Sequence, residues 1–252
     1  MKLGAQLFSL RGQMQTEEDI RRGFARLSEM GYSCVQVSGI ASIPAEHLRE
    51  ISHSSGLPVV CTHNPIGRIL EETDELIREH KIIGCPVIGL GCMPPEYREN
   101  EEGFLRFIDD LKKPVAKILD SGLHFAYHNH HFELEKRQKD GTPLYDLLLS
   151  HCPDWQFILD VYWTAYAGFD PLSYIARLAP ERLPNLHIKD MAGDEKRSIC
   201  ACGRGITDLR AIVETCRAHG VKHLLVEQDN ATDAPDPFGE MACSLQTLKA
   251  LL

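Results

Sequence analysis

Eight short apolar runs, rich in β-branched residues, recur along the whole of the 252-residue chain. Their starts lie about 24 to 40 residues apart, a spacing typical of repeated strand–helix units. The runs cover residues 2–8, 34–39, 58–63, 86–91, 124–130, 155–161, 183–191 and 223–229. Because eight such units close a parallel barrel, the pattern predicts a single-domain (β/α)8 TIM barrel over residues 1–252.

The segments between these runs have helical spacing of their apolar residues. In residues 17–31, Ile20, Phe24, Leu27 and Met30 share one helix face. Several segments close with a glycine just before the next run, the usual signal for a helix end, at Gly31, Gly56, Gly84, Gly122 and Gly220. The alternative fold, an open doubly wound sheet, usually carries a glycine-rich phosphate turn after its first strand. No such turn follows residues 2–8, so the barrel is favoured.

Charge and hydropathy narrow the classes of partner. The formal net charge of −9 and a pI near 5.7 disfavour nucleic acid, whose phosphates are bound by clustered lysine and arginine. No apolar run approaches the roughly 20 residues of a membrane-spanning helix, so we expect no membrane partner. The first residues read as a strand and not as a signal peptide, which predicts a cytoplasmic protein.

The cysteine pattern predicts reduced thiols. Nine cysteines are scattered along the chain, and without a secretion signal a disulfide framework is not expected. The one close pair, Cys200 and Cys202, lacks the second Cys or His pair that a structural zinc site needs.

Metal-binding residue types stand at the ends of the later runs. Asp160, His187 and Glu227 each occur where a predicted strand ends, and the fifth run ends in His128, Asn129, His130 and His131, followed by Glu133. In a barrel of this kind, residues at the carboxyl ends of the strands converge on one mouth. Carboxylate oxygens with an imidazole suit a divalent ion that keeps positions open for substrate oxygens. Any one of these residues alone would also fit a loop cap or a satisfied core group.

The motifs that carry these residues resemble a known family. The opening KLGAQLFSLR, then YHNHHFE, LDVYW, HIKDM, the glycine loop CGRGITD and the final VEQD resemble the sugar phosphate isomerase/epimerase group of the xylose-isomerase-like barrels, also described as the AP endonuclease family 2 superfamily. The resemblance extends over essentially the whole chain. It implies one divalent metal ion, with Mn²⁺ the first expectation and Mg, Co or Zn as alternatives.

Within that resemblance, Asp160, His187 and Glu227 are implied as three metal ligands. Many relatives carry a glutamate directly at the end of the fifth strand, where this chain has Tyr127-His128-Asn129. We predict Glu133 as the fourth ligand, with His130 as the competing candidate.

Other residues of the mouth are predicted to contact a polyol. Gln6 and Arg11 are expected at the end of the first strand, Gln36 at the end of the second, His63 at the end of the third and His128 at the end of the fifth. Many epimerase relatives have a histidine where this chain has Trp163, which suggests a stacking surface for a sugar ring here.

Lys189 lies two residues beyond His187, so it points to the same side of its strand. It could neutralise an enolate or protonate a leaving hydroxyl; a surface salt bridge is the alternative. Gly203 and Gly205 are expected to let their loop approach substrate closely, and Asp208 to cap the next helix.

This constellation suits proton abstraction beside a carbonyl. We expect a metal-dependent isomerase or epimerase of a keto sugar or related polyol, working through an enediolate, with Glu227 or Glu133 as base and His128, His130 or Lys189 as acid. A dehydratase of a keto-inositol or 3-keto-sugar is the main alternative. An abasic-site endonuclease and a non-catalytic sugar-binding barrel are less favoured, and a homo-oligomer is expected from family habit alone.

Overall fold

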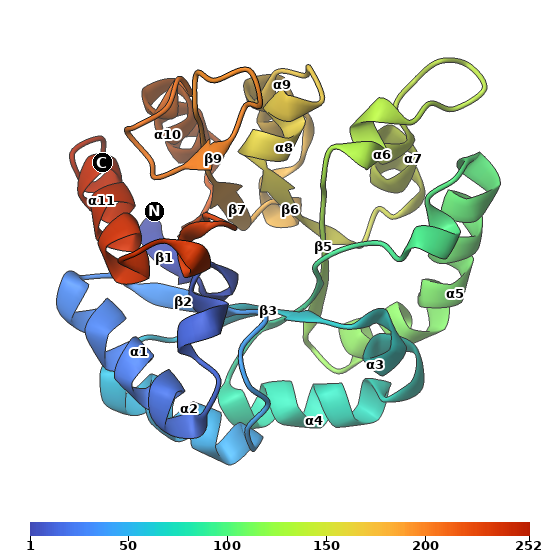
Figure 1. Cartoon of the computed structure of the whole chain (residues 1–252). Helices are drawn as coiled ribbons and strands as arrows, with labels where there is room; N and C mark the ends of the chain where they lie inside the picture. The colour runs from blue at the N-terminus through green and yellow to red at the C-terminus, as the bar shows by residue number, and fades with distance from the viewer.

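Eight parallel strands close into a barrel in the computed structural model, which describes residues 1–252 (Figure 1). Its strands are β1 (Lys2–Gln6), β2 (Cys34–Val37), β3 (Val59–Asn64), β4 (Val87–Leu90), β5 (His124–His128), β6 (Gln156–Asp160), β7 (Asn185–Ile188) and β10 (His223–Val226). Each strand pairs with its neighbour in sequence order, and β1 closes the ring against β10. The predicted (β/α)8 barrel and all eight of its strand positions are confirmed.

Helices surround the barrel on its outer side (Figure 1). The α-helices are α1 (Glu17–Met30), α2 (Ala45–Ser55), α3 (Ile66–Glu71), α4 (Thr73–Ile83), α5 (Glu101–Asp120), α6 (Phe132–Glu135), α7 (Leu144–His151), α8 (Val161–Tyr166), α9 (Pro171–Arg177), α10 (Leu209–His219) and α11 (Pro237–Lys249). Short 3-10 turns are η1 (Leu7–Gln13), η2 (Pro95–Tyr97), η3 (Pro180–Arg182) and η4 (Ala231–Asp233). None of the helices is both long and apolar enough to cross a membrane.

The main hydrophobic core lies between the strands and the helices. On α1, Ile20, Phe24 and Leu27 are fully buried in it, as their spacing predicts. A second, smaller hydrophobic cluster lies inside the barrel. It consists of Cys61, Val87, Ala126 and Ile158. These side chains fill part of the interior below the mouth, and in a barrel of this kind the site lies at the carboxyl ends of the strands.

The predicted helix signals hold at particular residues. Gly31, with φ +94°, ends α1 in the left-handed conformation that favours glycine. The Asp208 side chain accepts the backbone N–H of Ala211 and caps α10, as predicted. All nine cysteines are free thiols, in agreement with the expected reduced state.

Two boundaries differ from the prediction. The seventh run, residues 183–191, ends its barrel strand at Ile188, and β8 (Asp190–Met191) pairs instead with β9 (Ile199–Cys200) as a separate antiparallel ribbon. The connection that follows the fifth run, residues 131–142, contains the short helix α6. Both changes begin where the chain leaves the barrel, because beyond the last ladder hydrogen bond local turn geometry decides its course.

Candidate metal centre

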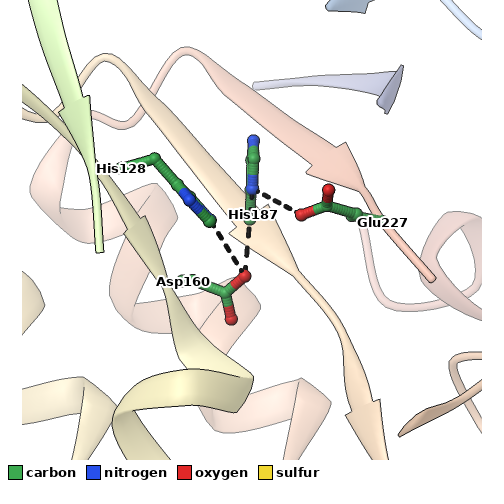
Figure 2. A group of neighbouring side chains, drawn as sticks. All are labelled: His128, Asp160, His187 and Glu227. Atoms are coloured by element: carbon green, nitrogen blue, oxygen red, sulfur yellow. Dashed lines mark hydrogen bonds and ion pairs between the residues drawn. The ribbon is translucent and has the colours of Figure 1, made fainter. Parts of the chain in front are cut away.

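Four side chains from four consecutive barrel strands point toward one another at the mouth (Figure 2). They are His128 at the end of β5, Asp160 at the end of β6, His187 on β7, and Glu227 directly after β10. Their donor atoms all lie within 4.8 Å of one another, and all four residues are buried. Two carboxylates and two imidazoles at this spacing can hold a metal ion.

The protonation of His187 follows from its neighbour across the barrel. Its Nε2 lies 2.7 Å from the side-chain oxygen of Gln36 on β2, so Nε2 carries the proton and donates it. The Nδ1 atom is therefore left with a free lone pair, and it has no hydrogen-bond partner. Burial lowers the pKa of His187, which keeps the ring neutral and able to act as a ligand.

The donor set fits a cation. Nδ1 of His187 has no hydrogen-bond partner and lies 2.7 Å from Oε2 of Glu227, an atom that also faces Nζ of Lys189 at 2.9 Å. Two acceptor atoms that face each other in a dry site repel unless a positive charge lies beside both. Their arrangement therefore matches the requirements of a divalent ion.

His128 is oriented in the same way. Its Nδ1 donates to the backbone oxygen of Gly91, at 2.9 Å, which turns Nε2 toward Oδ2 of Asp160 at 3.2 Å. Burial opposes a charge on this ring, but the hydrogen bond to Asp160 outweighs it and raises the pKa of His128. A backbone partner on the outer nitrogen is the usual arrangement for a metal-binding histidine.

Asp160 combines the two roles considered for it from the sequence. Its Oδ1 accepts the backbone N–H of Trp163 and so caps α8, while Oδ2 faces the four-residue cluster. Although burial acts against the charged form, Lys189 and His128 lower the pKa of Asp160 to about 2. The carboxylate is thus ionised at neutral pH.

Lys189 is buried beside this cluster and forms no surface salt bridge. Its Nζ lies 3.0 Å from Asp160 Oδ2, 2.9 Å from Glu227 Oε2 and 3.1 Å from Asp229 Oδ2. Burial disfavours the ammonium, but the three carboxylates outweigh it and raise the pKa of Lys189. The lysine is therefore charged and held in place.

The structure does not bring Glu133 into the cluster. Its Oε1 accepts a hydrogen bond from the Tyr127 hydroxyl and its Oε2 accepts the backbone N–H of His130, at 2.8 Å. Tyr127 packs edge-on against Phe107 of α5, so this carboxylate lies in the layer between barrel and helices. His128, predicted to contact substrate, is the fourth member of the cluster instead. His130, the competing candidate, also lies outside the set of four.

A cleft of about 490 Å³ opens beside this cluster, and two of the four residues, His128 and Glu227, belong to its wall. Of the predicted residues, His63, His128, His130 and Glu227 line it, together with Phe8 and Asp229. Burial, followed by the neighbouring His128, lowers the pKa of both His63 and His130 well below the usual value. Both rings are neutral imidazoles, and Nε2 of His63 and Nδ1 of His130 have no hydrogen-bond partner.

The remaining predicted contacts lie behind the cleft. Gln6 accepts the backbone N–H of Phe8, and Gln36 is occupied by His187; neither lines the cleft. Trp163 also lies outside it, with Lys189 over its ring at 5.5 Å, so the predicted stacking surface for a sugar lies beneath the lysine. Arg11 donates to the backbone oxygens of Phe8 and Asp229.

Two residues of the site were missed. Asp229 belongs to the VEQD motif and lines the cleft two residues beyond Glu227, and its spacing from Glu227 could have identified it, as the spacing of Lys189 from His187 did. Burial, with the nearby Glu227, raises the pKa of Asp229 to about 6. Phe8 gave no sequence signal, because its place in the cleft depends on the 3-10 turn η1.

The loop that carries Gly203 and Gly205 is held by hydrogen bonds to the side chain of Asp190. The carboxylate of Asp190 accepts the backbone N–H groups of Gly203, Gly205 and Thr207. A Cβ at Gly205 would lie 2.2 Å from the backbone oxygen of Met191. The glycines thus allow close approach to Asp190, and neither lines the cleft.

Comparison with known proteins agrees with this fold. The model of the xylose isomerase-like TIM barrel family matches residues 24–250. A sugar phosphate isomerase/epimerase from Parabacteroides distasonis superposes with a TM-score of 0.80 at 21% identity, covering 99% of this chain and 94% of that one.

Two further structures carry other activities in their names. A probable 3-DHS dehydratase from Bacillus anthracis has a TM-score of 0.74 at 13% identity, covering 99% of both chains. A D-allulose 3-epimerase from Methylomonas sp. has a TM-score of 0.73 at 14% identity, covering 100% of this chain and 98% of that one. No match was found among curated proteins. At such identities the structural likeness shows the fold alone, while the family model covers most of the sequence: this chain belongs to the xylose isomerase-like TIM barrel family.

Proposed function

We propose that this protein is a divalent-metal-dependent isomerase or epimerase that moves a proton beside the carbonyl of a keto sugar or related polyol. The observation that carries the proposal is the convergence of four donor groups within 4.8 Å of one another, in which the unpartnered Nδ1 of His187 faces Oε2 of Glu227 at 2.7 Å beside an open cleft. The names of the Parabacteroides and Methylomonas proteins support the sugar chemistry.

The metal ligands in this proposal are His128, Asp160, His187 and Glu227. Mn²⁺ is the first choice, because a mixed imidazole and carboxylate set with open positions suits it, and Mg²⁺, Co²⁺ and Zn²⁺ remain candidates for the metal analysis. When bound, the ion would polarise the substrate carbonyl and lower the cost of the enediolate.

The chain's own residues supply the proton transfer. Glu227 is ionised, since Lys189 and His187 outweigh the effect of burial and lower the pKa of its carboxyl group well below the usual value. It lines the cleft and so can take a proton from the carbon beside the carbonyl. His130, a neutral imidazole on the cleft wall, can donate to or accept from a substrate oxygen.

Lys189 has a positioning role in this scheme. Its ammonium holds Asp160 and Glu227 in a fixed arrangement through contacts of 3.0 and 2.9 Å. Because it is almost fully buried and does not line the cleft, it acts on substrate through these carboxylates.

A dehydratase is the second candidate. A second neutral imidazole, His63, lines the cleft with a free Nε2, and it could direct the departure of a β-hydroxyl after the same proton abstraction. The named activity of the Bacillus anthracis protein, a probable dehydratase, supports keeping this outcome.

Proton exchange in heavy water tests the proposal. The Mn²⁺-loaded protein is incubated in D₂O with D-fructose, D-allulose, D-xylulose or scyllo-inosose, and the products are followed by NMR. The proposed activity predicts deuterium at the carbon beside the carbonyl together with an isomer or epimer. A dehydratase predicts a product that has lost water.

Matched variants make this test specific. Glu227→Gln should abolish exchange, whereas Glu135→Gln, at an exposed carboxylate of α6, should leave it unchanged. Exchange that survives in Glu227→Gln would contradict the role given to Glu227. A native protein that exchanges no proton from any keto sugar or inosose offered would contradict the proposed function.

A further inference from the structure

A second cavity adjoins the cleft on the outer side of β2 and β3. Its volume is about 380 Å³, and it shares five wall residues with the cleft, namely Ser38, Gly39, His63, Asn64 and Pro65. Figure 1 shows β2 and β3 beside the helices α2 and α4, which form its outer wall. A ligand seated on the metal centre therefore lies next to this second space.

The end of β3 contributes side chains to both spaces. His63 lines the cleft and the second cavity, whereas Thr62 lines only the second cavity. Consecutive residues of a strand face opposite sides of the sheet. The end of β3 is thus the shared wall.

His80, Thr62 and the Asn64 amide nitrogen, three polar groups of the second cavity, have partners within the protein. His80 donates from Nδ1 to the backbone oxygen of Leu76 and accepts at Nε2 from the Thr62 hydroxyl, each at 2.7 Å. The Asn64 amide in turn donates to the Thr62 hydroxyl, at 2.7 Å. These hydrogen bonds hold the wall in place, and the groups that make them need no hydrogen bond from a ligand.

The one cation of this cavity is also occupied. Arg68 pairs through both terminal nitrogens with Glu79, at 3.1 Å each, and through Nε with Glu72 at 2.7 Å. A guanidinium held by two carboxylates has no charge to offer to a phosphate or carboxylate of a ligand. An anionic substituent is therefore excluded from this space.

Apart from Ser38 and Ser42, the rest of the lining is apolar. It comes from the loop after β2 and from α2 and α4, and its members are Val37, Ile40, Ala41, Ile43, Leu48 and Ile83. A cavity of roughly 150 Å³ lined by such side chains accepts benzene, so the volume here is ample for an aryl or short alkyl group.

We propose that this second cavity is a subsite for an uncharged apolar substituent carried by the polyol substrate, so that the protein binds a substituted sugar more tightly than a free sugar or a sugar phosphate. This inference rests on the proposed function for the sugar moiety. The subsite itself is formed by the loop after β2, β3, α2 and α4, and none of the four candidate metal ligands belongs to its wall.

The first test measures the subsite without a sugar or a metal. Binding of 4-fluorobenzyl alcohol is followed by ¹⁹F NMR for the native protein, for Ile43→Asp, which places a charge in the cavity, and for Ala41→Phe, which fills it. Both variants should bind the alcohol at least about tenfold more weakly. The control Ile206→Asp, at a residue 69% exposed outside the cavity, should bind as the native protein does.

Thermal unfolding midpoints verify that each variant is folded. Because Ile43 and Ala41 are only half-buried, the folded state should tolerate both changes. Equal binding of the alcohol to native protein and to both cavity variants, or no binding to the native protein, would overturn the subsite.

The second test asks whether sugar and substituent belong to one ligand. Phenyl and methyl β-D-glucopyranoside carry the same neutral ring, and calorimetry with the Mn²⁺-loaded native protein should show tighter binding of the phenyl compound by about tenfold. Ile43→Asp should remove that difference and leave the methyl compound unchanged. Equal affinities in the native protein would overturn the link between subsite and substrate.

The variant Glu227→Gln separates this inference from the proposed function. It should lose metal and keep its affinity for 4-fluorobenzyl alcohol. Failure of the metal chemistry therefore leaves the alcohol assay intact, and failure of the subsite leaves the proton exchange assay intact.

Discussion

The Nε2 atom of His187 donates to the side-chain oxygen of Gln36 across the barrel, at 2.7 Å, although the two residues are 151 positions apart in the chain. This contact fixes which nitrogen of the imidazole carries the proton and leaves Nδ1 free beside Glu227. Gln36, predicted to bind substrate, thus orients a histidine of the candidate metal centre.

Gln36→Leu should weaken metal binding by about 10- to 100-fold, since removing the partner of a metal-binding histidine releases its tautomer and orientation. Calorimetric titration of the metal-free protein with Mn²⁺ measures the change. Gln6→Leu is the control, because Gln6 is equally buried and accepts only the backbone N–H of Phe8. Equal loss in both variants would show a general effect on the barrel.

Glu133 should make stability depend on pH. Burial raises the pKa of its carboxyl group to about 7, against 4.5 for the free side chain. Because the folded pKa is the higher one, the stabilisation is fully present below about pH 4.5 and is lost as the pH rises through 7. The shift corresponds to a change on the order of 3 kcal/mol.

Urea unfolding of native protein and Glu133→Gln between pH 4 and 8 measures this effect. The difference in free energy of unfolding between the two proteins should shift in favour of the variant as the pH rises. A difference that stays constant over this range would contradict the role of Glu133 as a buried, titrating group.

Asp190→Ala should destabilise the protein by about 3 kcal/mol, because three backbone N–H groups of the loop would lose a charged acceptor. These groups belong to Gly203, Gly205 and Thr207. Asp194→Ala is the comparison, since its exposed carboxylate accepts the backbone N–H of Ser198, and it should cost less than about 1 kcal/mol. Chemical unfolding of both variants decides the point; similar small losses would contradict the anchoring role of Asp190.

The sequence was sufficient to predict the barrel because its strands are signalled locally. Each apolar run is bounded by a glycine or a polar turn, and the repeat of these runs sets the number of strands. Asp160, His187 and Glu227 follow from the same register, since residues that end neighbouring parallel strands meet at one mouth.

The fourth position of the cluster depends on geometry that spacing does not encode. Glu133 lies only five residues beyond His128 in sequence, but the turn into α6 directs its carboxylate back toward Tyr127 on the outer side of β5. A strand-end histidine pointing inward needs no such turn. The contact between His187 and Gln36 could not be predicted from the sequence either, because it depends on closure of the whole barrel.

The metal content of the purified protein shows directly whether the four-residue cluster of His128, Asp160, His187 and Glu227 holds a divalent ion. Elemental analysis, without added chelator, is applied to the native chain, to His128→Gln and to Glu133→Gln. We expect about one divalent ion per chain in the native protein and in Glu133→Gln, and little or none in His128→Gln. The reason is that His128 belongs to the four-residue cluster, whereas the Glu133 carboxylate faces Tyr127. A native protein that takes up no ion even when Mn²⁺ is supplied, or loss of the ion in Glu133→Gln with retention in His128→Gln, would contradict the account.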